Sequence, residues 1–166
     1  MAKLKYLIMV YLVSVATLVN AGITDFTLPD LQNKRQTYSD LKGEKYTILD
    51  FWATWCKPCQ RSIPEMIELY DRYQDRGVEF IGINIDAPRN LSKVRPVSQS
   101  LGINYPVLLD SNSELMGKLH VTVVPTLLVL DKTDEIVYRH QGYRPGDEKI
   151  LAEKLEELLK NTEQNE

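Results

Sequence analysis

The chain has 166 residues, of which 43% are hydrophobic and 26% are charged, a composition that excludes a disordered protein and fits one globular domain. Its formal charge is −3, so no nucleic acid is expected as a partner, because such binding needs a concentrated basic surface. Its two cysteines are too few for a disulfide framework, so their role depends on where they lie.

The first 21 residues have the pattern of a secretory signal peptide. Two lysines precede an apolar run from Tyr6 to Val19, and Ala21 is a small residue of the kind found directly before a cleavage site. We place the cut after Ala21, which leaves residues 22–166 as one domain. An uncleaved membrane anchor is the alternative, because Leu4–Ile23 has about the 20 residues that cross a bilayer. Both interpretations place the domain outside the cytoplasm.

Hydrophobic periodicity then predicts strands that alternate with helices. The run YTILDFW, residues 46–52, is almost continuously apolar, as expected for a strand covered on both faces, and Asp50 interrupts it. Apolar residues spaced by three and four over 57–76 mark one stripe of a helix. In chain order we expect strands at 26–28, 46–52, 78–85, 105–109, 126–130 and 136–141, and helices at 57–76, 91–101, 114–119 and 147–159.

The last predicted helix closes the domain. It should pack through its apolar residues Ile150, Leu151, Leu155, Leu158 and Leu159. The polar tail, 160–166, should fray. Strands that alternate with helices, followed by a hairpin and this helix, predict an α/β fold with a mixed central sheet and helices on both faces.

Cys56 and Cys59 form a CxxC motif where the strand 46–52 leads into the next helix. Positions i and i+3 of a first helical turn are close enough for two sulfurs to form and reopen a disulfide. At this position Cys56 faces unpaired backbone N–H groups and the positive end of the helix dipole, and Lys57 adds a positive charge, all of which favour its thiolate. Pro58 fits here because first-turn N–H groups have no intrahelical partner.

Two other uses of a CxxC motif stay open at this stage. A zinc site would need His120 and His140 as further ligands, and these lie 20 positions apart, unlike the short spacings of compact sites. A static disulfide is the second alternative, and it would stabilise the fold little because it closes a very short loop.

The sequence around the motif closely resembles the active-site segment of thioredoxins. The run DFWATWCKPC, residues 50–59, carries the resemblance, and Pro64 matches the proline that kinks the following helix in that family. Downstream, Val124–Thr126 resembles the loop with the family's cis-proline, and Gly142 matches a glycine near the last strand. The resemblance covers residues 25–159 and implies a thioredoxin fold.

Two added features resemble the exported TlpA-like subgroup, namely an N-terminal extension over 26–43 and an inserted helix and strand from Arg89 to Asp110. This likeness implies a periplasmic or membrane-tethered thiol–disulfide oxidoreductase that reduces protein disulfides and needs no cofactor beyond its dithiol. It further implies protein substrates, among them the cysteines of apocytochrome c, and a membrane electron donor that keeps the dithiol reduced.

The resemblance also implies catalytic roles. Cys56 should attack the substrate and Cys59 should resolve the mixed disulfide, while Asp50, buried behind Cys59, takes and returns its proton. The alternative for Asp50 is an exposed position at the end of the strand. Gly82 stands where thioredoxins usually carry a lysine, and Ser62 where several subgroup members carry a glutamate. We therefore expect a raised pKa of Asp50, which then does the acid–base work alone.

Three further residues are expected to contact substrate. If Pro125 is cis, the Val124 backbone stays free to pair with an extended substrate segment beside the sulfurs. Trp55 should offer an exposed docking surface, whereas Trp52 belongs to the core.

Competing functions follow from the same residues. A CxxC pair can also serve an oxidant or isomerase, because such pairs span a wide range of reduction potentials. A non-catalytic module could hold an extended peptide and keep its disulfide inert. A thiol peroxidase is a further alternative, although a lone reactive cysteine in a different loop would be its usual sign.

Overall fold

The computed structural model describes residues 23–164. The predicted signal peptide or anchor and its cleavage point lie outside this part of the chain. Among the described helices, none has the length and apolar character that crossing a membrane requires.

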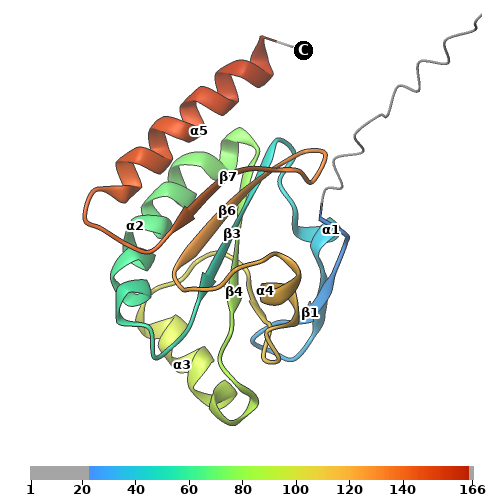
Figure 1. The fold of residues 1–166 in the computed structure, drawn as a ribbon, viewed down its shortest axis with the longest axis vertical. Coiled ribbons are helices and arrows are strands. Elements are labelled where there is room, and N and C mark those ends of the chain that lie inside the picture. Colours follow the sequence, from blue (N-terminus) through green and yellow to red (C-terminus); the bar gives the residue numbers. More distant parts are fainter. Residues whose placement is uncertain (1–22, 165–166) are drawn as a thin grey trace, which may run out of the picture.

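A five-stranded sheet in the order β5-β4-β3-β6-β7 forms the centre of the fold (Figure 1). Its strands are β3 (Tyr46–Trp52), β4 (Val78–Asn84), β5 (Val107–Leu109), β6 (Thr126–Asp131) and β7 (Ile136–Gln141). β3 runs parallel to β4 and antiparallel to β6. β4 pairs parallel with β5, and β6 pairs antiparallel with β7. The sheet is therefore mixed, as predicted.

Helices cover both faces of this sheet. The α-helices are α1 (Tyr38–Leu41), α2 (Lys57–Tyr73), α3 (Leu91–Ser100), α4 (Glu114–Lys118) and α5 (Asp147–Glu163), with 3-10 turns η1 (Gln74–Arg76) and η2 (Pro88–Asn90). In Figure 1, α2 and α5 lie on one side of the sheet, and α1 and α4 lie on the other. Buried residues of α2 and α5 form one core cluster with the sheet, and buried residues of α1 and α4 form another. The predicted α/β architecture with helices on both faces is confirmed.

The N-terminal extension forms a small sheet of its own. β1 (Thr27–Pro29) pairs antiparallel with β2 (Arg35–Thr37), and an isolated bridge joins Asp30 to Leu108 of β5. No strand was predicted at 35–37, because Arg35–Thr37 is polar and lacks an apolar alternation, and no helix was predicted at 38–41, because four residues are too few to show a helical period. The extension thus packs beside the edge strand of the main sheet.

Residues of β3 alternate between the two faces, and this alternation places Asp50. Ile48 belongs to the cluster with α2 and α5, whereas Leu49 and Phe51 belong to the cluster on the opposite face. Because successive side chains of a strand point to opposite faces, Asp50 shares a face with Ile48 and Trp52. This is the face that α2 covers (Figure 1).

The C-terminal helix differs from its prediction in two ways. It continues to Glu163 instead of fraying after residue 159, and the Tyr46 hydroxyl explains this, because it lies 3.1 Å from the Leu158 carbonyl oxygen and 2.7 Å from Thr162 Oγ1. Ile150 was expected in the core but is 51% exposed. The buried stripe of the helix consists of Leu151, Leu155 and Leu159.

The edge strand β5 begins two residues later than predicted. Pro106 has no N–H group and cannot donate to a ladder, so regular pairing begins after it. The Pro106 carbonyl still accepts a 2.8 Å hydrogen bond from the Gly82 N–H. Tyr105, directly before this proline, is buried in the core against α2 and β4.

Candidate active site

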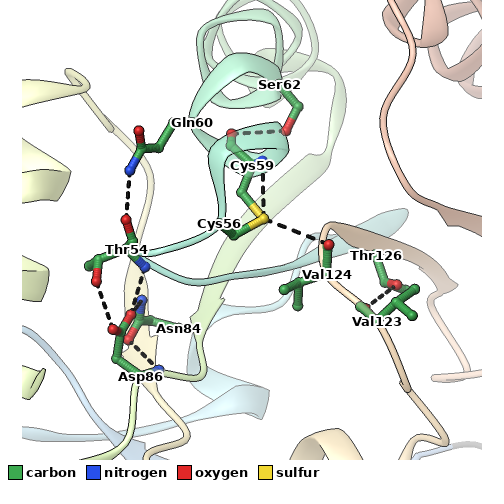
Figure 2. The surroundings of a disulfide bond; sticks show 10 residues. All are labelled: Thr54, Cys56, Cys59, Gln60, Ser62, Asn84, Asp86, Val123, Val124 and Thr126. Atoms are coloured by element: carbon green, nitrogen blue, oxygen red, sulfur yellow. Dashed lines mark hydrogen bonds between the residues drawn. A yellow bond between two sulfur atoms is a disulfide. The ribbon is translucent and has the colours of Figure 1, made fainter. Parts of the chain in front are cut away.

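The two cysteines lie at the N-terminus of α2 and are joined by a disulfide bond (Figure 2). Cys56 is the N-cap residue, and its sulfur accepts a 3.2 Å hydrogen bond from the Cys59 N–H. Cys56 keeps 4% of its surface exposed and Cys59 keeps none. An incoming thiol or disulfide therefore reaches Cys56 first.

The residues between the cysteines have separate functions in the turn. Pro58 lies in the first turn of α2, as predicted. The Lys57 ammonium donates to Gln60 Oε1 over 3.2 Å, and Gln60 in turn donates from Nε2 to the Thr54 carbonyl over 2.6 Å. The Gln60–Thr54 hydrogen bond ties the start of the helix to the preceding loop (Figure 2).

A buried carboxylate fixes the loop before Cys56. Asp86 accepts hydrogen bonds of 2.7 Å from both the N–H and the hydroxyl of Thr54. It also accepts one of 2.9 Å from Asn84 Nδ2, and its own N–H donates to Asn84 Oδ1 (Figure 2). Sequence reasoning assigned Asp86 no role, because its main partner lies 32 positions away. The sequence feature that could have indicated this role is a polar residue just after a buried strand.

The loop opposite the disulfide carries the predicted cis-proline. The Val124–Pro125 peptide bond is cis, and the Val124 carbonyl oxygen lies 3.6 Å from Cys56 Sγ (Figure 2). A disulfide sulfur has no proton, so this is a van der Waals contact here, whereas a reduced thiol could donate across it. The loop is held by Thr126 Oγ1, which donates to the Val123 carbonyl, and by the Gly142 N–H, which donates to the Pro125 carbonyl, both over 2.8 Å.

Apolar surface adjoins the disulfide. Trp55, one residue before Cys56, is 60% exposed, as predicted, and Val123 in the cis-proline loop is 49% exposed. Trp52 is buried. Val123 was not predicted, since one valine in a loop gives no sequence signal of exposure.

Asp50 is buried on β3, and the alternative of an exposed strand end is therefore wrong. Burial raises its pKa to about 7, and a hydrogen bond from the Tyr105 hydroxyl to Oδ2, 3.2 Å long, partly opposes that rise. Within the described residues Asp50 Oδ1 has no hydrogen-bond partner. Cys59 packs in one cluster with Trp52, on the same sheet face as Asp50. The pKa of Asp50 is thus raised, as predicted, and burial is the main cause.

Gly82 pairs with Asp50 across β3 and β4, and neighbouring side chains fill the space beside it. A Cβ placed at Gly82 would lie 3.3 Å from Trp52 Nε1, 3.3 Å from Tyr105 Cε2 and 3.4 Å from a Val107 methyl carbon. Tyr105 thus takes up the room that a side chain at residue 82 would need. Sequence reasoning missed Tyr105, because its contact with Asp50 spans 55 positions.

Two further residues from the sequence have structural contacts. Ser62 is buried, and its hydroxyl donates to the Cys59 carbonyl over 3.0 Å. His140 Nε2 lies 2.8 Å from Asp147 Oδ2. Over residues 23–164 no group of three or more histidine, cysteine and carboxylate side chains could hold a metal ion.

Comparison with known proteins assigns the chain to a family. The model of the AhpC/TSA family matches residues 19–139. The thiol-disulfide oxidoreductase ResA of Geobacillus kaustophilus (strain HTA426) is 35% identical over 121 residues, which cover 73% of this chain and 68% of that protein.

Solved structures agree with this assignment. The solution structure of an uncharacterized thioredoxin-like protein from Porphyromonas gingivalis has a TM-score of 0.68 and 37% identity. The match covers 81% of this chain and 89% of that protein's chain. The crystal structure of StoA from Bacillus subtilis has a TM-score of 0.64 and 26% identity, and the match covers 81% of this chain and 96% of the StoA chain. The resemblance to thioredoxin-like oxidoreductases is confirmed. The chain therefore belongs to the AhpC/TSA family, and it is a thioredoxin-like thiol–disulfide oxidoreductase with Cys56 and Cys59 as its cysteine pair.

Proposed function

We propose that this oxidoreductase reduces protein disulfides outside the cytoplasm, with Cys56 as the attacking sulfur and Cys59 as the resolving one. The observation that carries the proposal is the difference between the two sulfurs. Cys56, at the N-terminus of α2, keeps 4% of its surface exposed, whereas Cys59 keeps none. Backbone N–H groups and the helix dipole stabilise a thiolate at the first position.

Reduction of a substrate then proceeds in two exchanges. The Cys56 thiolate attacks one sulfur of the substrate disulfide, which forms a Cys56–substrate disulfide and releases the other substrate sulfur as a thiolate. Cys59 next gives its proton to Asp50, and the Cys59 thiolate attacks Cys56 Sγ. The second substrate sulfur leaves with its electron pair, and the enzyme ends as the Cys56–Cys59 disulfide seen here. Two electrons have passed to the substrate.

The substrate segment is proposed to bind beside the cis-proline. The carbonyl oxygen of Val124 lies next to Cys56 Sγ, so an extended segment placed here would bring its own sulfur to Cys56. Pro125 supports this geometry, and Trp55 adds exposed apolar surface. Protein disulfides are thus the substrate class, and we propose that the disulfide of apocytochrome c is among them.

The proposed extracytoplasmic location and the proposed reducing direction both rest on the sequence. Residues 1–21 have the pattern of a signal peptide or anchor, with residues 22–166 as the single exported domain. The reducing direction rests on the extension and the inserted α3 and β5, which resemble those of exported reductases. A membrane electron donor would return the disulfide to the dithiol.

A trapping experiment tests this proposal. The Cys59→Ser variant keeps the attacking sulfur but cannot resolve the mixed disulfide, so it should accumulate covalent protein adducts that a reductant removes. The Cys56→Ser variant is the matched control and should carry none. The proposal would be abandoned if Cys59→Ser collected no adducts in the extracytoplasmic fraction, or if both variants collected the same ones.

A further inference from the structure

The partner of Asp50 is a tyrosine from the edge of the sheet. The Tyr105 hydroxyl is buried and donates to Asp50 Oδ2 over 3.2 Å. Burial, with the nearby Asp50 charge, raises the pKa of Tyr105 well above its ordinary value, so the phenol stays protonated. It is therefore a constant hydrogen-bond donor to the carboxylate.

Packing fixes the position of this hydroxyl. The Tyr105 ring contacts Tyr70 edge-on at 5.7 Å between centroids and Phe80 at 5.9 Å. Its Cε2 atom fills the space beside Gly82, the residue paired with Asp50. A side chain at residue 82 would crowd the ring, because its Cβ would lie only 3.3 Å from Cε2. The glycine and the tyrosine thus form one arrangement that brings a neutral donor to Asp50.

The two oxygens of Asp50 are consequently not equivalent. Oδ2 accepts from Tyr105, whereas Oδ1 has no hydrogen-bond partner within residues 23–164. We propose that Tyr105 is a positioning residue for the resolving step, holding Oδ2 so that Oδ1 exchanges the Cys59 proton. This inference rests on the proposed role of Asp50 and adds to it the group that orients the carboxylate.

Tyr105 gains and loses no proton in the resolving step. The Cys59 proton moves to Asp50 Oδ1, the Cys59 thiolate attacks Cys56 Sγ, and the substrate thiolate leaves. The Tyr105 O–H bond remains intact throughout. Because the hydrogen bond favours the charged carboxylate, its loss should raise the pKa of Asp50 and reduce the ionised fraction at a given pH.

The reaction of the reduced protein with 5,5′-dithiobis(2-nitrobenzoic acid) separates the two exchanges. Attack by Cys56 releases one coloured thiolate, and attack by Cys59 on the resulting mixed disulfide releases a second. In Tyr105→Phe, which keeps the ring, the second phase should be about 10-fold slower at pH 6. Its pH midpoint should move to higher pH, and the first phase should keep its rate.

Tyr73→Phe is a matched control, since the Tyr73 hydroxyl also donates to a carboxylate, Glu156 Oε1, over 3.0 Å. It should leave the second phase and its pH midpoint unchanged. In Asp50→Asn the second phase should slow at least as much as in Tyr105→Phe, and adding Tyr105→Phe to Asp50→Asn should slow it no further.

The results distinguish a failure of the proposed acid–base role of Asp50 from a failure of the positioning role of Tyr105. If Asp50→Asn leaves the second phase unchanged, the proposed role of Asp50 is wrong. If Asp50→Asn slows that phase but Tyr105→Phe leaves its rate and pH midpoint unchanged, the positioning role alone is wrong. A further slowing in the double variant would also overturn it, because Tyr105 would then act independently of Asp50.

Discussion

Asp50 and Asp86 are both buried aspartates near the cysteine pair, yet their surroundings differ. Asp86 accepts three hydrogen bonds, which hold the loop before Cys56 to the end of β4. Asp50 accepts one, from Tyr105, and its other oxygen has no partner among the described residues. A carboxylate whose two oxygens both accept hydrogen bonds can anchor a loop, whereas a buried one with few donors is poised to bind a proton. The number of accepted hydrogen bonds thus distinguishes Asp86, which holds the loop, from Asp50, the proposed acid–base group.

The largest expected effect is a pH dependence of stability that Asp50 causes. Burial raises its pKa from 3.8 to about 7, so the contribution of this carboxyl is most favourable below pH 3.8 and is lost as the pH rises through 7. Between pH 4 and pH 8 the free energy of unfolding should fall by about 4 kcal/mol through this group.

Comparison with Asp50→Asn isolates this effect, because the other titrating groups are common to both proteins. Urea unfolding at several pH values should show the difference between the two proteins change over that window. A constant difference would mean that Asp50 does not titrate as its burial requires.

The next effect is on rate. An asparagine at residue 50 cannot take the Cys59 proton, so Asp50→Asn should slow the resolving step about 100-fold at pH 7. The two-phase release of coloured thiolate described above measures it. Asp86→Asn should leave the pH midpoint of the resolving step unchanged. If Asp86→Asn and Asp50→Asn shifted this midpoint equally, the proposed distinction between the two aspartates would be wrong.

Asp86→Asn should instead lower stability. The amide cannot accept from all three donors, and a buried donor left unpaired costs about 2 kcal/mol. Urea unfolding at pH 7 should show this loss, while Asp50→Asn at the same pH should lose no stability. Unchanged stability of Asp86→Asn would show that the loop before Cys56 is held by other contacts.

The smallest effect concerns the exposed surface. Trp55→Ala should raise the KM for a protein disulfide substrate about 5-fold through lost apolar contact. Ile150→Ala is the matched control, since this residue is also exposed but lies on α5. Equal KM values for Trp55→Ala and the unmodified protein would remove the tryptophan from the substrate site.

The local parts of the site follow from the sequence, and the distant parts do not. The cysteine pair, Pro58 and the buried Asp50 lie within one strand–helix junction, so their spacing and neighbours predict their places. Tyr105 contacts Asp50 across 55 positions, and nothing in its own neighbourhood indicates this contact.

The fold shows the same division. The periodicity of β3 and α2 fixed their limits well, because both elements have a buried face along their whole length. The end of α5 was misjudged, because the residue that anchors it, Tyr46, is 116 positions from Thr162. The start of β5 was misjudged because Pro106 interrupts the ladder without interrupting the apolar pattern.

The reduction potential of the Cys56–Cys59 couple tests the central claim most directly. Equilibration with glutathione or dithiothreitol buffers, followed by thiol labelling and mass measurement, gives its value. A reductant of protein disulfides should have a potential near that of thioredoxin, about −270 mV. A value near that of the strong oxidant DsbA, about −120 mV, would contradict the proposed reducing direction.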